Sequence, residues 1–569
     1  MSELNVVVIG GVSAGPKAAA RLKRLVPDAK VTLIERGHDI SYGGCGLPYF
    51  IGSTVKQLSD LMTTSWDAVR TPEFMKATKD IDTLLGWEAT KIDRENKIVE
   101  VKEVATGEEK KLPYDKVVIA TGAKNFVPPI KNVDAQGVFG LKTPTDGVNI
   151  QNYLKTGVGK AVVIGAGLIG METAEAFANW GVDVTVIEMM DQIFPKLVDK
   201  DLAFVVQNYL ESEDMNFMLS TAVKEIKVDD EGKVCGVVTD KGELDCELVL
   251  VSAGVRSEVS LAVDAGLEVD RTIVVNDYMQ TSDPDIYAGG DCVSCTHRIT
   301  GKKIFAPMGS TANKHGRIIA DNIATNNTEK FPGVLGTSIC KMFDWSIGKV
   351  GLTEADAQRE GYDYVTCVVP GSDITHFIPG KKTIMIKVVA EKGTRRILGV
   401  QAVGPGEVAK RIDTMAGALS VKPDMTAFDM ANMDLAYAPP FSSAVDNLLV
   451  NGNVIGNELD GRAHSINFWD TVERFNDDKS LFVDLRSDSE FSKHPFECDN
   501  YYRIPIEELR ARCNELPKDK DILLFCHLST RGYEAQLILE REGFKNVYFI
   551  QGGIPVSYTH LTLPTKRIV

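Results

Sequence analysis

One stretch of the chain places a lone cysteine where a thiol could do redox chemistry. Residues 41–49 read SYGGCGLPY, and no second cysteine stands two or four residues from Cys45. The glycines let the backbone approach a ligand closely. Because it has no nearby partner thiol in the sequence, Cys45 must cycle with an external sulfur or as a sulfenic acid. The alternative is a buried core cysteine, the commonest role of a free thiol.

A second cysteine lies between an apolar strand and a helix. The strand expected over residues 521–525 is followed by Cys526, and a tight loop leads through Arg531 into a helix expected over 533–542. Backbone N–H groups, the helix dipole and Arg531 would all stabilise an anion, so we predict a thiolate at neutral pH. The loop is shorter than that of cysteine phosphatases, which build a wider cradle.

The elements that must position Cys45 begin at the N-terminus. An apolar strand at 6–9 leads into GGVSAG at 10–15, a helix to about Leu25 and a second strand at 31–35 that ends at Glu35. This order predicts a dinucleotide-binding unit, with a pyrophosphate at the helix N-terminus and Glu35 on ribose hydroxyls. Val12 replaces the middle glycine of the usual G-x-G-x-x-G pattern.

Three cations share one face of that first helix. Lys17, Arg21 and Arg24 are spaced i, i+4 and i+7, so their side chains project on the same side. Such a stripe is either a solvated face or a site for the phosphates of an anionic thiol. Lys79 is a further candidate phosphate contact.

The strand, turn and helix pattern occurs a second time, which indicates an internal duplication. Residues 161–170 read AVVIGAGLIG and contain Gly165, Gly167 and Gly170, and the next strand ends at Glu188. A carboxylate accepts from a free 2′-hydroxyl and repels a 2′-phosphate, so NADH is favoured over NADPH.

The composition of the chain limits which binding partners and which cellular compartment we expect for the protein. The 569 residues carry a net charge of -16, which argues against nucleic acid or an anionic membrane as the main partner. No signal peptide or membrane span is expected, and the ten scattered cysteines do not resemble a disulfide framework. We therefore expect a cytoplasmic protein with several domains.

Taken together, these motifs resemble CoA-disulfide reductase and NADH oxidase flavoproteins over about residues 1–450. The resemblance also rests on GGD at 289–291 and YAPPFS at 437–442. It implies an α/β fold with two Rossmann-like domains, for FAD and NAD, and an α+β dimerisation domain. The expected boundaries are 1–150 and 256–328 for the FAD-binding domain, 151–255 for the NAD-binding domain and 329–452 for the dimerisation domain.

The same resemblance assigns roles to individual residues. Cys45 would be the redox nucleophile, and Tyr437 from the second subunit of a homodimer would donate a proton or hydrogen bond to its sulfur. FAD would contact Gly10, Gly11, Val12, Gly15, Glu35, Arg36, Thr121, Gly122, Asp291 and Ala312. NAD would contact Gly165, Gly167, Gly170 and Glu188. CoA would contact Lys17, Arg21, Arg24, Ser41, Gly44 and Lys79.

The C-terminal region resembles a rhodanese, a sulfurtransferase that carries sulfane sulfur as Cys-S-S⁻. The resemblance rests on VDLR at 483–486, the loop from Cys526 to Arg531, and QGG at 551–553. A polar linker is expected at 453–465 and the rhodanese-like domain at 466–555. Residues 556–569 are expected to be a non-native tail, because β-branched residues and Pro564 disfavour a closing helix.

The sequence thus predicts an NADH-dependent FAD enzyme that reduces CoA disulfide, CoA persulfide or polysulfide, with a sulfane-sulfur donor serving Cys526. One alternative is an NADH oxidase or peroxidase that acts through a sulfenic acid at Cys45. Another is a flavin-based redox sensor. Cys292 and Cys295 form a C-x-x-C, for which a redox pair is one alternative, although the resemblance places it away from the flavin ring. No metal site is expected there because a second pair is missing. The sequence leaves open whether Cys526 passes sulfur directly to Cys45 or through CoA.

Overall fold

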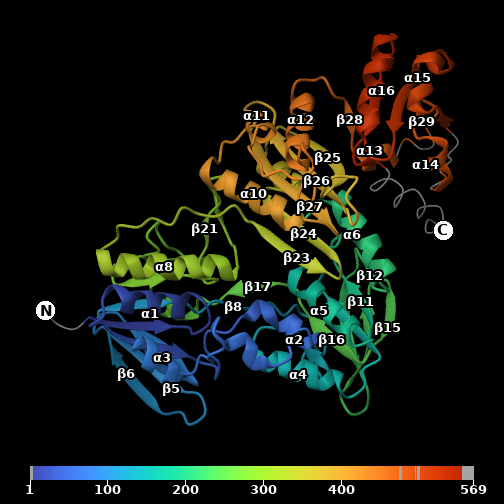
Figure 1. The fold of residues 1–569 in the computed structure, drawn as a ribbon. Helices are drawn as coiled ribbons and strands as arrows, with labels where there is room; N and C mark the ends of the chain where they lie inside the picture. Colours follow the sequence, from blue (N-terminus) through green and yellow to red (C-terminus); the bar gives the residue numbers. More distant parts are fainter. Residues whose placement is uncertain (1–3, 473, 475–476, 494, 496–499, 554–569) are drawn as a thin grey trace. The chain divides into compact units, whose positions relative to one another are not determined.

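The computed structural model describes residues 4–472, 474, 477–493, 495 and 500–553. The chain divides into two compact units, one of Met1–Met189 with Met215–Val334 and one of Met190–Asp214 with Leu335–Val569 (Figure 1). None of the helices in the described part of the chain combines the length and apolar character that a membrane crossing requires.

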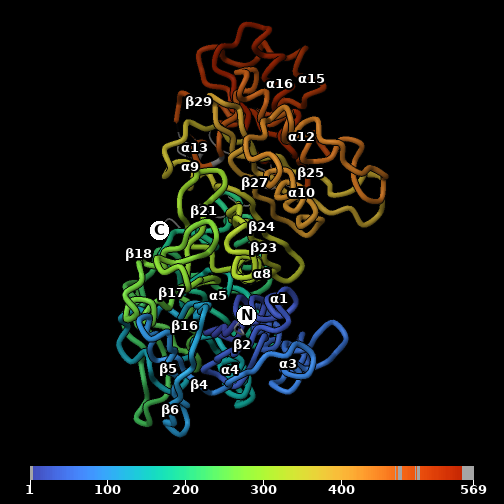
Figure 2. Tube along the Cα trace, turned by 90° about the vertical axis from the view of Figure 1, so that its left-hand side faces the viewer, coloured from blue at the N-terminus to red at the C-terminus, as the bar shows by residue number. Residues whose placement is uncertain are grey.

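The first unit begins with a parallel sheet of strand order β20-β7-β1-β2-β3. Strands β1, β7 and β20 are largely buried and therefore read as apolar runs in the sequence. Helix α1 (Ala14–Leu25) packs on this sheet, and α8 (Gly309–Thr325) lies alongside α1 (Figures 1 and 2). The strands are β1 (Asn5–Ile9), β2 (Lys30–Glu35), β3 (Asp82–Leu85), β7 (Lys116–Ile119) and β20 (Ile286–Ala288).

A second parallel sheet, of order β12-β11-β10-β16-β9, repeats the design of the first. Helix α5 (Leu168–Ala178) follows the glycine turn and packs on β10 and β11. The duplication predicted from the sequence is therefore confirmed as two Rossmann-like sheets. The strands are β9 (Val138–Phe139), β10 (Lys160–Ile164), β11 (Asp183–Ile187), β12 (Asn216–Met218) and β16 (Leu248–Val251).

Smaller elements complete the first unit. Two antiparallel sheets comprise β4 (Trp87–Asp93), β5 (Ile98–Glu103) and β6 (Glu109–Pro113), and β13 (Val223–Val228), β14 (Val234–Thr239) and β15 (Gly242–Asp245). The strand pairs are β8 (Ala123–Asn125) with β17 (Val255–Ser257), β18 (Val269–Asp270) with β19 (Thr272–Ile273), and β21 (Cys295–Thr296) with β22 (Lys303–Ile304). The short helices are η1 (Gly44–Gly46), α2 (Leu47–Ile51), η2 (Leu58–Met62), α3 (Pro72–Lys79), α4 (Pro144–Leu154) and α7 (Ser260–Asp264).

The second unit contains an antiparallel sheet of order β23-β24-β27-β26-β25. Its strands are β23 (Ser338–Met342), β24 (Trp345–Gly351), β25 (Tyr364–Ser372), β26 (Thr383–Glu391) and β27 (Ile397–Gly404). Its helices are α6 (Lys200–Ser212), α9 (Glu354–Glu360), α10 (Val408–Val421), α11 (Ala427–Ala431) and α12 (Asn447–Leu459). Antiparallel strands with helices beside them match the α+β domain that the sequence predicts.

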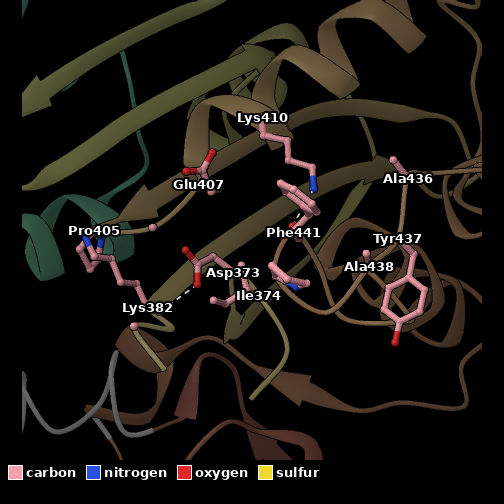
Figure 3. A pocket seen from close by; sticks show the side chains of 13 residues that line it. Asp373, Ile374, Lys382, Pro405, Glu407, Lys410, Ala436, Tyr437, Ala438 and Phe441 are labelled. Atoms are coloured by element: carbon pink, nitrogen blue, oxygen red, sulfur yellow. Dashed lines mark hydrogen bonds between the residues drawn. The ribbon is translucent and has the colours of Figure 1, made fainter. Parts of the chain in front are cut away.

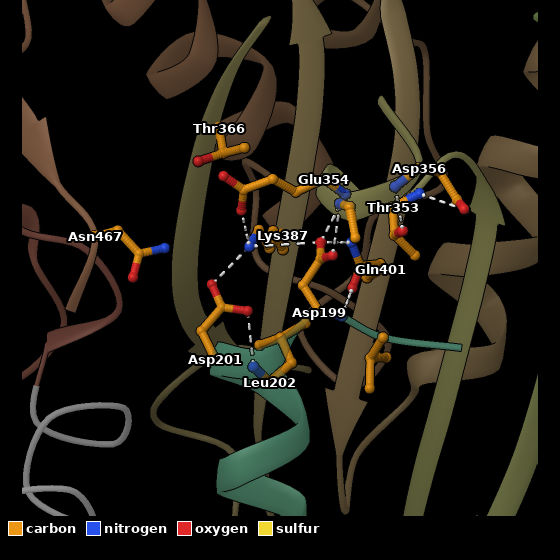
Figure 4. Close-up of polar contacts among 12 residues, drawn as sticks. Asp199, Asp201, Leu202, Thr353, Glu354, Asp356, Thr366, Lys387, Gln401 and Asn467 are labelled. Atoms are coloured by element: carbon orange, nitrogen blue, oxygen red, sulfur yellow. Dashed lines mark hydrogen bonds and ion pairs between the residues drawn. The ribbon is translucent and has the colours of Figure 1, made fainter. Parts of the chain in front are cut away.

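A buried lysine connects α6 and α9 to this sheet (Figure 4). Lys387 of β26 is 1% exposed, and its Nζ lies 2.7 Å from Asp201 Oδ2 and 2.6 Å from Glu354 Oε2. Asp199, just before α6, accepts hydrogen bonds from the N–H groups of Glu354 and Ala355 at the start of α9. The paired charges satisfy one another, which a buried ion needs.

The C-terminal part of the second unit is a parallel sheet of order β28-β32-β31-β29-β30. The strands are β28 (Ser465–Ile466), β29 (Ser480–Asp484), β30 (Tyr501–Arg503), β31 (Asp521–Phe525) and β32 (Val547–Ile550). The helical elements are α13 (Phe468–Val472), α14 (Asp488–Lys493), α15 (Ile506–Arg512), η3 (Cys513–Glu515) and α16 (Thr530–Arg541). The parallel sheet with its helices agrees with the rhodanese-like α/β domain that the sequence predicts.

Some local expectations differ from the structure. Helix α16 begins at Thr530, three residues earlier than expected, because Ser529 adopts φ 65° and turns the loop directly into the helix. Helix α12 continues to Leu459, so the first part of the expected linker is helical. The expected tail at 556–569 lies outside the described residues.

Candidate active site

Both glycine-rich turns bring the backbone close to a neighbouring strand end. Gly10 has φ +109°, and a Cβ there would lie 2.1 Å from Ala120 O. Gly165 repeats this arrangement with φ +108° and a Cβ position 2.4 Å from Ser252 O. Only glycine fits such a turn. The chain therefore builds the same turn twice, at the sheet edge where dinucleotides bind in folds of this kind.

The acidic residues at the ends of β2 and β11 contact these turns in the same way. Glu35 Oε2 accepts a hydrogen bond from Gly11 N at 2.7 Å. Glu188 Oε2 accepts one from Ala166 N at 2.8 Å. That both carboxylates also bind ribose hydroxyls stays a prediction. The residue after Glu188 is the exposed Met189, which provides no positive charge for a 2′-phosphate.

Two glycines near these turns leave open space beside the backbone. A Cβ added at Gly167 or at Gly122 would meet no atom within 4 Å, so the backbone there is open to a ligand. Gly15 and Gly170 have no room for a side chain, because an added Cβ would lie 1.9 Å from Gly10 O and 2.1 Å from Gly165 O, respectively. Val12 takes the position of Gly167 in the first turn and is half-buried.

The other residues expected at FAD divide between the sheet edge and the surface. Thr121 and Gly122 follow β7 and Asp291 follows β20, so all three lie at the carboxyl edge of the first sheet. Ala312 is buried in the first turn of α8. Arg36, in contrast, is 72% exposed and pairs with Glu88 at 3.5 Å. The roles of these residues toward FAD stay predictions.

Cys45 lies in the short helix η1 and is exposed. The atoms packed around its thiol raise its pKa by desolvation, and the charges of Glu172 and Asp291 raise it further. Lys142 and the backbone N–H of Cys45 act in the opposite direction. The surroundings therefore favour the neutral thiol over the thiolate.

Glu172 and Lys142 are neighbours of Cys45 that the sequence analysis missed. Burial raises the pKa of Glu172 to about 7, so this carboxyl can exchange a proton at neutral pH. Lys142 Nζ lies 3.8 Å from Asp291 Oδ2. A signal for Glu172 existed, since it stands on α5 two residues after Gly170. Lys142 carried no local signal.

Two hydrogen bonds to the backbone of Ser41 fix the turn that leads to Cys45. Ser41 N donates to Gly11 O at 2.7 Å, and Ser41 O accepts from Arg70 Nη1 at 3.0 Å. Ser41 has φ 53°, a left-handed conformation that these bonds help to hold. Gly44 begins η1 directly before Cys45 and is half-buried.

Two of the three cations predicted on α1, Lys17 and Arg24, lie in a cluster with Lys79 and with Arg70, which was not predicted. The pKa of Lys79 is lowered by burial and then by the charges of Arg24, Arg70 and Lys17, so these four cations lie together. Arg70 was missed by the sequence analysis because it lies on a separate loop. Arg21 Nε instead pairs with Asp321 at 2.7 Å. Binding of CoA by any of them stays a prediction.

Tyr437 borders a pocket of the second unit with a volume of about 740 Å³ (Figure 3). The tyrosine is 53% exposed and Phe441 on the same loop is 67% exposed. Lys382, Lys410 and Glu407 also line the pocket, and Lys410 Nζ donates to Phe441 O at 2.9 Å. An exposed aromatic loop of this kind is typical of a surface that meets another chain.

Cys526 follows β31 and is completely buried. The side chain of Arg531 contacts the thiol and is held in turn by two hydrogen bonds to the Glu490 carboxylate, at 2.7 and 2.6 Å. These bonds lower the pKa of Glu490 to about 2. Glu490, on α14, was also missed by the sequence analysis. Whether Cys526 is a thiolate stays a prediction.

The loop after Cys526 is packed against the end of β32. Ser529 Oγ donates to Ile550 O at 2.8 Å. A Cβ at Gly553 would lie 2.5 Å from His527 O, and its φ of +59° also favours glycine. The QGG segment therefore closes over the loop, and Gly552 N bonds Val368 O of β25 at 3.0 Å.

Comparison with known proteins agrees with this architecture. Residues 4–314 match the family model of the pyridine nucleotide-disulphide oxidoreductases, 337–449 match the dimerisation domain of that family, and 470–556 match a rhodanese-like domain. The NAD(P)H sulfur oxidoreductase (CoA-dependent) of Pyrococcus furiosus is 38% identical over 458 residues, which are 80% of this chain and 100% of that protein.

Two solved structures cover nearly the whole chain. An NAD-dependent persulfide reductase from A. fulgidus is 42% identical with a TM-score of 0.92, covering 97% of this chain and 100% of its own. Reduced CoADR-RHD from Bacillus anthracis is 32% identical with a TM-score of 0.91, covering 99% of both chains. On these matches and on its duplicated nucleotide turns, the chain belongs to the pyridine nucleotide-disulphide oxidoreductase family and carries a C-terminal rhodanese-like domain.

Proposed function

We propose that this protein uses NADH and FAD to reduce CoA disulfide, CoA persulfide or polysulfide at Cys45. One observation carries the proposal. The exposed residue Cys45 follows a turn whose Ser41 carbonyl accepts a hydrogen bond from Arg70, and Arg70 belongs to a cluster of four cations. Such a cluster suits the phosphates of an anionic thiol. The names of the relatives, which include CoA-dependent sulfur and persulfide reduction, support the same substrate class.

The cofactors would be held by the two glycine turns. Gly10, Gly15, Glu35 and Asp291 would hold FAD, and the turn of Gly165 with Glu188 would hold NADH in preference to NADPH. When bound, NADH and FAD supply the electron pair that returns oxidised Cys45 to the thiol.

Cys45 would act as the nucleophile. With a persulfide, Cys45 attacks the CoA-bearing sulfur, HS⁻ leaves and a mixed disulfide between Cys45 and CoA forms. Two-electron reduction of this disulfide would release CoA thiolate and restore the Cys45 thiolate. Glu172, with a pKa of about 7, is the neighbouring group that we propose takes up the proton of Cys45.

The rhodanese-like domain would provide the sulfur. Cys526 would carry a sulfane sulfur received from a donor such as thiosulfate, with Arg531 next to the anion. We propose a homodimer in which the Tyr437 loop meets the second subunit, since the chain contains the family's dimerisation domain. A reducing cytoplasm suits this chemistry, and the nine cysteines among the described residues are free thiols.

Two measurements test this function. The intact mass of the purified protein before and after thiol reduction should show loss of CoA from Cys45 and loss of sulfur from Cys526. Steady-state NADH consumption should then be faster with CoA persulfide than with air-saturated buffer. A much larger kcat/KM for oxygen would favour an NADH oxidase instead, and turnover too slow for catalysis would favour a redox sensor.

A further inference from the structure

Two cysteines outside both nucleotide turns lie at neighbouring backbone positions on the two strands of a hairpin in the first unit. Strands β14 and β15 pair Gly236 with Asp245, so Cys235 and Cys246 form the next opposed pair. Cys246 N donates to Cys235 O at 3.4 Å. The Cα atoms of such a hydrogen-bonded pair lie about 5.5 Å apart, within the range of about 4.4–6.8 Å that a disulfide spans.

The two thiols differ in access. Cys235 is exposed, whereas Cys246 is 2% exposed. Burial, and after it the charges of Cys235, Asp245 and Glu247, raise the pKa of Cys246 to about 12. An incoming reagent therefore reaches Cys235 first, and Cys246 can react only with a group already attached to Cys235.

The charged residues around Cys235 and Cys246 influence which disulfide reagents can approach them. Lys227 on the neighbouring strand β13 lies within electrostatic reach of Cys235, but its ammonium is paired with Glu243 at 2.7 Å. Asp245 and Glu247 are close to Cys246 and carry negative charge. The surroundings of this pair thus repel anions, in contrast to the cationic cluster near Cys45.

We propose that Cys235 and Cys246 form a second thiol–disulfide exchange site, which takes neutral or cationic low-molecular-weight disulfides and closes to a cross-strand disulfide. The Cys235 thiolate attacks RS–SR, forms Cys235–S–S–R and releases RS⁻. Cys246 then loses its proton to solvent, attacks the Cys235 sulfur and releases the second RS⁻. In total the two cysteines lose two hydrogens and one disulfide becomes two thiols.

The bond would fasten the hairpin where the chain enters β16, which begins at Leu248 in the second parallel sheet. This chemistry does not depend on the function proposed above, because it needs neither cofactor nor Cys45.

The test uses the full-length protein without NADH and cystamine as a cationic disulfide. After free thiols are blocked at acid pH, trypsin cleaves after Lys233, Lys241 and Arg256 without reduction. We expect a disulfide between peptides 234–241 and 242–256, formed about tenfold faster with cystamine than with anionic glutathione disulfide at low salt. Added salt should narrow this difference. Cys292 and Cys295, which are buried, serve as an internal control that stays unlinked.

Two variants complete the experiment. Cys235→Ser should leave Cys246 unmodified, and Cys246→Ser should leave cystamine attached to Cys235. The proposal is overturned if the wild-type protein keeps cystamine on Cys235 while Cys246 remains a free thiol, or if neither cysteine reacts. It is also overturned if glutathione disulfide reacts as fast as cystamine.

Discussion

Glu490 holds the guanidinium of Arg531 with both carboxylate oxygens, Oε2 at 2.7 Å from Nη1 and Oε1 at 2.6 Å from Nη2. This pairing has two opposite effects on Cys526: it orients Arg531 toward the thiol, and it neutralises part of the positive charge. Bidentate pairs fix geometry as well as add energy, so we expect orientation to dominate.

Glu490→Gln should therefore slow sulfur transfer to cyanide from thiosulfate about tenfold, because one charge-assisted bond to Arg531 is lost. Glu540→Gln is the matched control, since Glu540 lies on α16 of the same domain and pairs with His464 instead of Arg531. Faster transfer in Glu490→Gln would show that Glu490 mainly neutralises Arg531.

Cys45→Ser should abolish NADH-dependent reduction of CoA disulfide and leave sulfur transfer by Cys526 unchanged. The reason is that no other cysteine stands beside Cys45 in the sequence to replace it. Cys235→Ser, which also removes an exposed thiol, should retain full activity. Disulfide reduction that survives in Cys45→Ser would contradict the assignment of the nucleophile.

Arg70→Ala should raise KM for CoA disulfide about tenfold, which corresponds to ~1.4 kcal/mol of lost binding. Its effect on a small uncharged disulfide should be minor, since that substrate carries no phosphates. Lys111→Ala removes an exposed charge from β6 (side chain 70% exposed) and should leave KM unchanged. Equal effects on charged and uncharged substrates would assign Arg70 a purely structural role at Ser41.

Glu172→Gln should make Cys45 reactive at lower pH. The negative charge of Glu172 raises the pKa of Cys45, so its removal must lower that pKa, and the rise of alkylation rate with pH should move toward acid. The rate of iodoacetamide labelling of Cys45 against pH measures this shift. Glu243→Gln, which removes an exposed carboxylate from β15, is the control. An unmoved profile in Glu172→Gln would remove Glu172 from the site.

Lys387→Met should destabilise the second unit by about 3–5 kcal/mol, because it leaves buried carboxylates without a partner. Burial already raises the pKa of Asp201, so in the variant the buried carboxyls should become protonated as the pH falls. The loss in free energy of unfolding relative to the wild-type protein should therefore be smaller in acid. Urea unfolding at pH 7 and pH 5 measures both effects. Lys392→Met, which breaks an exposed pair with Asp363, should cost at most about 1 kcal/mol.

The sequence alone predicted the parts of the fold that depend on local pattern. The runs at 6–9 and 161–164 are apolar because β1 and β10 are covered on both faces, and the glycines after them mark turns that only glycine can form. Cys45 and Cys526 were found for the same reason, since each stands at a fixed point of a short motif. The cationic stripe followed from helical spacing, but spacing could not reveal that Arg21 pairs with Asp321 on α8.

Only the tertiary structure decided which distant side chains meet. Arg70 joins Lys17, Arg24 and Lys79, Glu172 and Lys142 lie near Cys45, and Glu490 holds Arg531. None of these contacts is set by neighbouring residues. Each depends on how separate strands and helices pack, and a side chain's charge carries no information about the segment that will pack beside it. The sequence by itself thus determined the nucleotide turns and the two thiols, whereas the folded chain determined the charges around them.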